Sequence, residues 1–363
     1  MRKIVSVKEL GEIITGNTPP RNDPDFYGDY KPFIKATDIS ESSKYTYKPE
    51  EYYSEKAYKK YIRSLIPKGS TCVVTIGSVG KKMTMAHCDL FINQAMNAIV
   101  PNQNFDSEYV YYVMKNNIHK LKKLDPGTAS GRENVSKSAF SNMEIEIDDD
   151  ITKQKKIGRI LSAYDNLIEN NQKQIKLLEE AAQRLYKQWF IDLRFPGHET
   201  TPIVDGLPEG WRTVSIQDVC KNIGAGGTPS RSQKNFWENG NIDWFKTQEL
   251  CDCWLFEASE KISEEGLKRS AAKMFPANSI LMAIYASPTL GRLGILTKEA
   301  CSNQAALCLQ ADESKVSNYW LYLKLFELRD RFNSIARGAG QQNISGIIVK
   351  ETEITLPAYS VME

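Results

Sequence analysis

The sequence predicts an α+β protein in which two homologous, mixed α/β domains are joined by a long coiled-coil helix. Three observations predict this: an internal repeat, a heptad pattern between the two copies, and strand-like and helical segments that recur within each copy. With 363 residues, the chain is long enough for two domains. We expect the first domain at residues 1–150, the helix at 151–192, a linker at 193–212 and the second domain at 213–363.

The repeat aligns residues 5–147 with residues 214–356 at a nearly constant offset. Short motifs match in the same order, and the sequences between them differ strongly. The clearest matches are Gly16-Asn17-Thr18-Pro19 with Gly226-Gly227-Thr228-Pro229, Asn93-Gln94-Ala95 with Asn303-Gln304-Ala305, and Asn134-Val135-Ser136 with Asn343-Ile344-Ser345. A shared scaffold with divergent loops suggests two related readers of different targets.

Within each copy the hydrophobic pattern predicts the same elements. The apolar runs at 72–79 and 279–286 are bounded by Gly or Pro and predict strands. Residues 107–124 and 317–332 have aromatic and aliphatic residues at helical spacing. Residues 143–147 and 352–356 alternate as edge strands do.

Residues 151–192 predict one long helix with a heptad seam. Proline is absent from it, and its only glycine is Gly158. About 40 residues at about 1.5 Å each give a rod of about 60 Å, which outruns one domain and therefore disfavours a core helix packed on a single domain. Apolar residues alternate at steps of four and three, which predicts a partner interface with Asn171 fixing the register: Ile157, Leu161, Tyr164, Ile168, Asn171, Ile175, Leu178, Ala182, Leu185 and Trp189.

A seam requires a partner helix. The repeat places a second helix of this kind near Ser360, and the sequence ends at Glu363. We therefore expect either a truncated chain or a partner helix from another subunit, such as a second copy of this chain.

Composition narrows the class of protein. Lys and Arg number 47 and Asp and Glu 45, so a net charge of +2 excludes a highly basic DNA-binding tail without excluding a local basic groove. No apolar run suggests a membrane span or a signal peptide, so we expect a cytoplasmic protein. The seven cysteines are scattered. Only Cys251 and Cys253 lie close together, so we expect reduced, buried thiols and no zinc site.

Catalytic motifs are missing from the sequence. The three histidines lack ligand or triad spacing, and Gly77 to Lys82 lacks the spacing of a phosphate-binding loop. We find no carboxylate constellation that recurs in both copies. The sequence therefore predicts a non-enzyme without a metal or a cofactor of its own.

Polar loop residues at matching positions suit nucleic acid better. Glycines permit close backbone approach, Arg reads guanine, Asn or Gln reads adenine, and Lys or Arg neutralises phosphates. Taken singly, each of these residues is more often part of a solvated polar loop than a DNA contact. Asn93-Gln94 and Asn303-Gln304 are interpreted as structural amides, and Thr18-Pro19 and Thr228-Pro229 as turn formers. The predicted DNA-binding residues are Lys35, Thr37, Ser78, Lys81, Ser130, Arg132, Asn134, Lys246, Thr247, Arg292, Gln341, Gln342 and Asn343.

Together these motifs resemble the DNA-specificity subunits of type I restriction-modification systems. The resemblance rests on the Gly-x-Thr-Pro turns with a following aromatic pair, the Val-Gly-Lys and Leu-Gly-Arg turns, the Asn-Gln-Ala segments and the helix QKKIGRILSAYDNLIENNQKQIKLLEEAAQRLYKQWF. It covers essentially the whole chain. Two departures are the missing second helix and the approach to the helix at Asp148-Asp149-Asp150.

The resemblance implies two target recognition domains, each reading one half of a bipartite, asymmetric site on double-stranded DNA. It implies that an adenine methyltransferase partner using S-adenosylmethionine supplies methylation, and that a translocating restriction subunit supplies cleavage. The family's spacer helices pair, set the distance between half-sites and contact the methyltransferase subunits. The alternative is a coiled-coil scaffold with twin protein-binding domains, for which the matched basic turns and Gln/Asn loops would not be needed.

Overall fold

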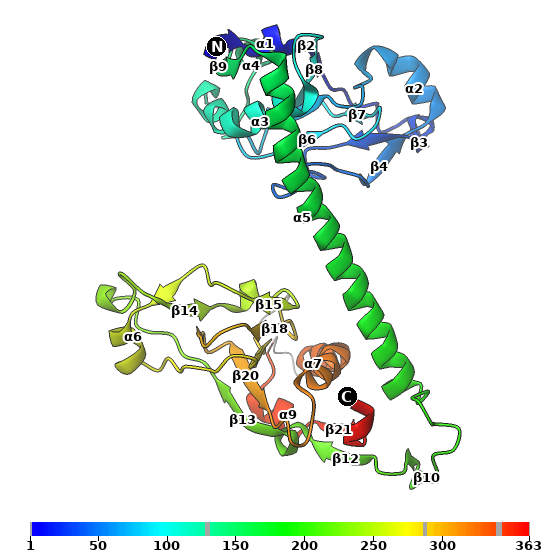
Figure 1. Ribbon diagram of the computed structural model, residues 1–363, viewed down its shortest axis with the longest axis vertical. Coiled ribbons are helices and arrows are strands. Elements are labelled where there is room, and N and C mark those ends of the chain that lie inside the picture. The colour runs from blue at the N-terminus through cyan, green and yellow to red at the C-terminus, as the bar shows by residue number, and fades with distance from the viewer. Residues whose placement is uncertain (1, 128–130, 286–288, 339–342, 363) are drawn as a thin grey trace. The chain divides into compact units, whose positions relative to one another are not determined.

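The computed structural model describes residues 2–127, 131–285, 289–338 and 343–362. The chain divides into two compact units, residues 1–176 (unit 1) and 177–363 (unit 2). Each unit holds one copy of the repeat and part of helix α5 (Ile151–Tyr186). The α+β fold predicted from the sequence, with twin domains and a long helix, is confirmed (Figure 1).

Unit 1 contains three sheets. A four-stranded sheet has the order β2-β8-β5-β6, a three-stranded sheet has the order β4-β3-β7, and β1 pairs with β9. All pairings are antiparallel except that of β3 with β7. The elements before α5 are β1 (Arg2–Ser6), α1 (Val7–Leu10), β2 (Gly11–Thr15), β3 (Tyr27–Ile34), β4 (Glu51–Tyr53), α2 (Glu55–Tyr61), β5 (Thr71–Val74), β6 (Met83–Met85), β7 (Phe91–Ile92), β8 (Met96–Pro101), α3 (Ser107–Asn117), α4 (Lys137–Ser141) and β9 (Glu144–Asp148).

Strand β5 lies at the centre of unit 1. Its four residues are buried, with Val73 in one apolar cluster and Cys72 and Val74 in another. A strand covered on both faces needs apolar residues at consecutive positions, which explains the continuous run TCVV. The predicted strand at 72–79 ends at Val74, and the remaining residues form a turn in which Thr75 and Val79 are still buried.

Unit 2 repeats this plan with five strands in its larger sheet, ordered β13-β20-β17-β18-β15, beside β16-β14-β19 and the pair β12-β21. Strand β17 is the counterpart of β5 and is likewise buried. The strands and α-helices of unit 2 after the linker are β12 (Arg212–Ser215), β13 (Cys220–Ala225), β14 (Ile242–Phe245), β15 (Cys253–Leu255), β16 (Lys261–Ile262), α6 (Glu264–Lys268), β17 (Ile280–Ala283), β18 (Leu293–Leu296), β19 (Cys301–Ser302), β20 (Ala306–Ala311), α7 (Asn318–Glu327), α8 (Arg329–Gly338), α9 (Gly346–Glu351), β21 (Glu353–Leu356) and α10 (Tyr359–Met362).

The predicted helices and edge strands are present in both units. The segment 107–124 forms α3 followed by a 3₁₀ turn, and 317–332 spans α7 and the start of α8. The alternating segments form β9 and β21, which pair with β1 and β12. Their alternate residues, such as Ile145 and Ile354, are buried as the alternation requires.

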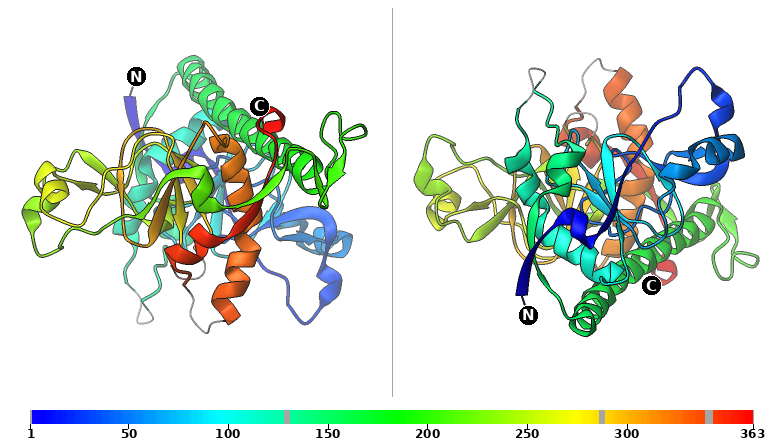
Figure 2. Two further views of the ribbon diagram at one scale, coloured as in Figure 1. Left: turned by 90° about the horizontal axis from the view of Figure 1, so that it is seen from below. Right: turned by 90° about the horizontal axis from the view of Figure 1, so that it is seen from above.

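Helix α5 is unbroken in every view (Figures 1 and 2) and continues into a π-helical turn at Lys187–Ile191. Its first turns pack on unit 1, so the expectation that the helix does not pack on a domain is wrong for this part. Gln154 is fully buried and bonds the backbone at Asp106 and Asp148. A Cβ on Gly158 would lie 2.8 Å from Glu108 Cβ, so only glycine permits this approach of α5 to α3.

The far end of α5 belongs to unit 2. Tyr186 is buried in the unit 2 core, where its hydroxyl donates to Glu327 at 2.9 Å, and Phe190 packs against the same cluster. The predicted linker contains one short hairpin, β10 (Ile203–Val204) with β11 (Leu207–Pro208). At the position where the repeat predicts a second helix, the described chain forms the single turn α10.

Cysteine burial differs from the expectation at four positions. Cys72, Cys301 and Cys308 are buried, whereas Cys88 and Cys220 are half-buried and Cys251 and Cys253 are exposed. Burial raises the pKa of Cys72 to about 12, which keeps it a thiol. None of the helices in the described part of the chain combines the length and apolar character that crossing a bilayer requires.

Candidate nucleic-acid interface

The turn that follows β5 is joined to the segment before α4, and we call residues 75–82 with 131–135 the loop junction of unit 1. Gly77 N donates to Glu133 O at 2.9 Å, Val79 N donates to the Glu133 carboxylate at 3.0 Å, and Val135 N donates to Thr75 O at 2.8 Å. These bonds bring together two loops that are separate in the sequence.

Four predicted DNA-binding residues of unit 1 lie at this junction. Lys81, Arg132 and Asn134 are exposed and Ser78 is half-buried. The Arg132 guanidinium lies over Gly77, where an added Cβ would come within 3.9 Å of its nitrogens. The structure therefore gathers Ser78, Arg132 and Asn134 on joined loops, and Ser130 lies outside the described residues.

In unit 2 the same junction is described at residues 284–285, 289–292 and 343–345. Tyr285 forms an isolated bridge with Asn343, as Ile76 does with Asn134. Ile344 N donates to Ile284 O at 3.0 Å. Asn343 is exposed and Arg292 is half-buried at the end of the turn. Gln341 and Gln342 lie outside the described residues.

A glycine with positive φ precedes the basic residue in each junction. Gly80 has φ 74° and Gly291 has φ 79°. An added Cβ would lie 2.9 Å from Lys122 Cγ at Gly80 and 2.8 Å from Arg329 Cγ at Gly291. Backbone conformation and space both require glycine here, which explains why the Gly-Lys and Gly-Arg turns match.

Lys35 and Lys246, also predicted to bind DNA, are occupied by carboxylates. Lys35 Nζ contacts Glu51 Oε1 at 3.1 Å and also pairs with Glu50, and Lys246 Nζ contacts Glu260 Oε1 at 2.7 Å. The hydrogen bond with Glu50 raises the pKa of Lys35. These ammonium groups position side chains within the unit and have little capacity left for a phosphate.

The threonines beside these lysines have different surroundings. Thr37 is exposed, but Thr247 is only 9% exposed and lies among the buried residues. A buried side chain cannot reach a base edge, so the interpretation of Thr247 as a DNA contact does not fit its position.

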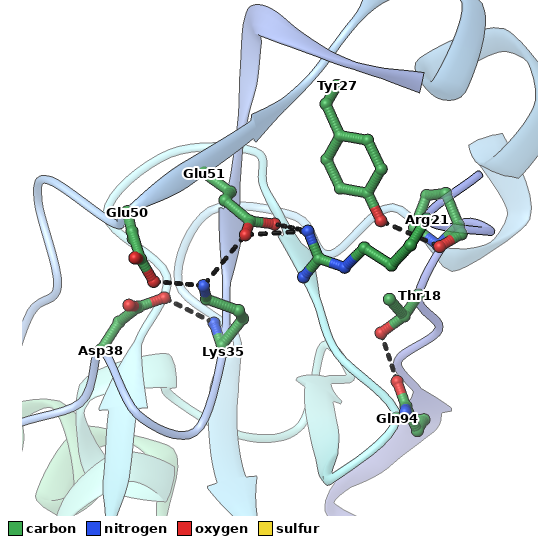
Figure 3. Close-up of polar contacts among 9 residues, drawn as sticks. Thr18, Arg21, Tyr27, Lys35, Asp38, Glu50, Glu51 and Gln94 are labelled. Carbon is green, nitrogen blue, oxygen red and sulfur yellow. Dashed lines mark hydrogen bonds and ion pairs between the residues drawn. The ribbon is translucent and has the colours of Figure 1, made fainter. Parts of the chain in front are cut away.

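The structure adds a polar corner that the sequence interpretation missed, which we define as Thr18, Arg21, Lys35, Glu51 and Gln94 (Figure 3). The Thr18 hydroxyl donates to Gln94 Oε1, and Arg21 Nη1 donates to both oxygens of Glu51 at 2.9 Å. Burial opposes ionisation of Glu51, but the hydrogen bonds from Arg21 and Lys35 outweigh it and lower the pKa of this carboxyl.

Unit 2 has the equivalent corner, formed by Thr228, Arg231, Lys246, Glu260 and Gln304. Bonds from Lys246 and Arg231 lower the pKa of Glu260. One carboxylate therefore recurs in each unit, Glu51 and Glu260, and it is neutralised by an arginine and a lysine and does not form a carboxylate pair.

The signal for this corner was present in the aligned Thr-Pro and Asn-Gln-Ala motifs. Gln94 and Gln304 are exposed, so they are not the buried structural amides that we expected. The buried amide oxygens instead belong to Asn93 and Asn303, which are neighbours in the same turns.

The seam residues of α5 are largely solvent-facing within their units. Tyr164 is 63% exposed, Ile168 52%, Ile175 55% and Leu178 70%. Ile157 and Leu161 line a cavity of about 350 Å³ beside Tyr109 in unit 1. Asn171 is exposed, Leu185 is 48% exposed, and Trp189 is half-buried. An apolar stripe this exposed is typical of a surface that binds a partner.

The chain belongs to the family of type I restriction modification DNA specificity domains, which it matches over residues 2–180 and 208–360. Among curated relatives, the type I restriction enzyme MjaIX specificity subunit of Methanocaldococcus jannaschii is 29% identical over 284 residues, 77% of this chain and 65% of that relative. The HindI specificity subunit of Haemophilus influenzae is 29% identical over 187 residues, 48% of this chain and 38% of its own. This chain therefore spans less than two thirds of the length of either relative.

The fold has a solved counterpart. The S subunit of a type I restriction-modification system from M. genitalium superposes with a TM-score of 0.65 and 13% sequence identity, covering 100% of this chain and 86% of that chain. At this identity the likeness shows the fold alone.

Proposed function

We propose that this chain is the DNA-reading subunit of a type I restriction-modification complex, with unit 1 and unit 2 each reading one half of a bipartite, asymmetric site on double-stranded DNA. One observation carries the proposal: the two units present equivalent loop junctions on a shared scaffold, and the sequences around their matched positions differ. Lys81 and Asn134 in unit 1 correspond to Arg292 and Asn343 in unit 2, whereas Arg132 aligns with Gln341 in the sequence. The scaffold function weighed above is not favoured, because the family is one of DNA specificity domains.

Methylation and cleavage belong to partners in this proposal. The chain carries no catalytic step itself. Methyltransferase subunits with S-adenosylmethionine act on the DNA, and a restriction and translocation subunit joins them. The exposed seam of α5, from Ile157 to Trp189, is the surface we assign to docking of the methyltransferase subunits or of another helix, including one from a second copy of this chain.

The first test maps methylated adenines in a host that expresses this chain with an adenine methyltransferase subunit encoded beside it. A bipartite, asymmetric motif supports the proposal. A palindromic motif would mean that one unit acts as a dimer. If no base is methylated, a second helix is added after Glu363, and continued absence of methylation would refute the proposal.

The second test assigns each unit to a half-site. Arg132→Ala should relax the bases read in one half only, and Gln341→Ala those in the other, because each good base contact contributes about 1–3 kcal/mol of discrimination. Lys59→Ala is the control, since Lys59 is 77% exposed on α2 and pairs only with Glu55 among its described ion pairs. Equal loss in both halves from either of these two variants would contradict the assignment of one unit to one half-site.

A further inference from the structure

Each polar corner holds an arginine over an aromatic ring. The Arg21 guanidinium carbon lies 4.8 Å from the centre of the Tyr27 ring, and that of Arg231 lies 3.6 Å from the centre of the Trp237 ring. Glu51 and Glu260 form ion pairs with these guanidiniums, and Arg231 Nη1 lies 2.5 Å from Glu260 Oε2. A ring and a carboxylate together fix the plane of the guanidinium before any ligand arrives.

The rings themselves are fixed by the Thr-Pro turn. The Tyr27 hydroxyl donates to Pro19 O at 2.8 Å, and Trp237 Nε1 donates to Ser230 O at 3.2 Å. The turn, the ring and the arginine therefore form one rigid arrangement that is present in both units. The residue types of the ring differ, but the position of the guanidinium relative to the turn is conserved.

The cations of the corner face solvent and the shared carboxylates lie behind them. The Arg21 and Arg231 side chains are 58% and 54% exposed, whereas Glu51 and Glu260 are 23% and 31% exposed. Each carboxylate also contacts the lysine on its inner side. The outward edge of each corner is therefore a donor surface, to which an oxyanion can bind.

The neighbouring glutamine adds a second donor. Gln94 Oε1 and Gln304 Oε1 each accept the hydroxyl proton of the adjacent threonine, which leaves the amide NH₂ as the outward group. This turn touches the loop junction, because Ile76 N donates to Ala95 O at 3.1 Å and Ile284 N donates to Ala305 O at 2.9 Å. The donors of the corner thus lie on the turn next to the loops assigned to base reading.

Residues that differ between the units can read half-sites that differ, but a feature retained in both units must contact something common to both half-sites. The sugar-phosphate backbone is common to every half-site, and phosphates are contacted by Arg and by neutral amide donors. We propose that Arg21 and Arg231 are a matched pair of phosphate contacts, one in each unit, assisted by Gln94 and Gln304. This inference rests on the proposed function and assigns a sequence-independent role within it.

The test measures binding of the full chain to a mixed-sequence DNA duplex over a series of salt concentrations. Arg21→Gln and Arg231→Gln remove the charge and keep most of the side-chain stem. The logarithm of the binding constant falls as the logarithm of the salt concentration rises, and each variant should make this slope shallower by about 1. The double variant should make it shallower by about 2.

Arg269→Gln is the matched control. Arg269 is 71% exposed and donates to Glu265 at 2.9 Å, so it has the same charge and the same kind of partner, but it lies at the C-cap of α6, outside the corner. Its slope should equal that of the original chain. Arg21→Lys and Arg231→Lys retain the charge, so they should keep the slope and lose only affinity, which separates a phosphate contact from a purely structural clamp.

The outcomes separate this inference from the proposed function. Unchanged slopes in both Gln variants, with the methylated motif intact, would overturn the phosphate contacts and leave the proposed function standing. Loss of methyltransferase binding with an unchanged DNA slope would overturn them in favour of a protein-docking surface. If the original chain shows no salt-dependent binding to DNA, the proposed function fails first.

Discussion

Gln154→Ala tests how α5 is held on unit 1. Gln154 is fully buried, its Nε2 donates to Asp148 O at 2.8 Å, and its Oε1 accepts from Asp106 N at 3.0 Å. Asp106 is the N-cap of α3 and Asp148 ends β9. One side chain therefore joins the helix to a helix start and a strand end at once.

The magnitude follows from the two backbone groups that the variant leaves without this partner. A buried polar group deprived of its hydrogen bond costs about 1–3 kcal/mol, so two such groups give about 2–6 kcal/mol. Water entering the space that the side chain vacates recovers part of this. We expect a loss of about 2–4 kcal/mol from the stability of unit 1.

Hydrogen exchange at the Asp106 amide measures this contact directly, because that amide is one of the two groups. A loss of about 2–4 kcal/mol corresponds to exchange about 30- to 1,000-fold faster. Urea unfolding should show the same loss in unit 1. Gln174→Ala is the control on the same helix, since Gln174 is exposed, and it should change stability by less than about 0.5 kcal/mol. Equal behaviour of the two variants would refute the reasoning.

Leu178→Asp places a carboxylate on a seam residue that is 70% exposed, so co-purification should show loss of the helix partner while both units stay folded. The control, Gln174→Asp, lies off the seam and should assemble normally. Assembly of both variants would exclude the seam as the docking surface. Gly80→Ala should cost about 1–3 kcal/mol in urea unfolding because its φ is 74°, whereas Gly224→Ala, which meets no atom within 4 Å, should stay within about 0.5 kcal/mol. Glu51→Gln should weaken unit 1 at neutral pH. The folded-state pKa of Glu51 is lowered, so its contribution is present above the ordinary value of 4.5 and is lost as pH falls through the folded pKa. If the difference in stability between the original chain and the variant is as large in acid as at neutral pH, this reasoning is contradicted.

Much of the fold could be predicted because its signals are periodic or repeated. The seam from Ile157 to Trp189 recurs in a helical period, and the run TCVV marks a strand buried on both faces. The turns of the loop junctions could also be predicted from the sequence, since the Gly-Lys and Gly-Arg turns match at positions where the backbone requires glycine. These patterns depend on residues that lie close together in the chain, and such residues can be read directly from the sequence.

The polar corners could not be predicted in the same way. Glu51 is 30 positions from Arg21, and Gln94 is 76 positions from Thr18. Their meeting depends on how β3, β4 and β7 pair, which no local pattern specifies. The burial of Thr247 likewise depends on packing within unit 2, which the polar segment around it does not reveal.

The sequence by itself therefore determined the duplicated domain, the long helix and its apolar seam, and the glycine turns of the loop junctions. Each of these is encoded by residues close together in the chain or by a direct match between the two copies. Only the tertiary structure decided that Lys35 and Lys246 are held by carboxylates, that Gln154 anchors α5, and that Arg21 and Arg231 face solvent against an aromatic ring. The physical reason is that hydrogen bonds and ion pairs act over a few ångströms in space, and strand pairing brings together residues that the sequence keeps far apart.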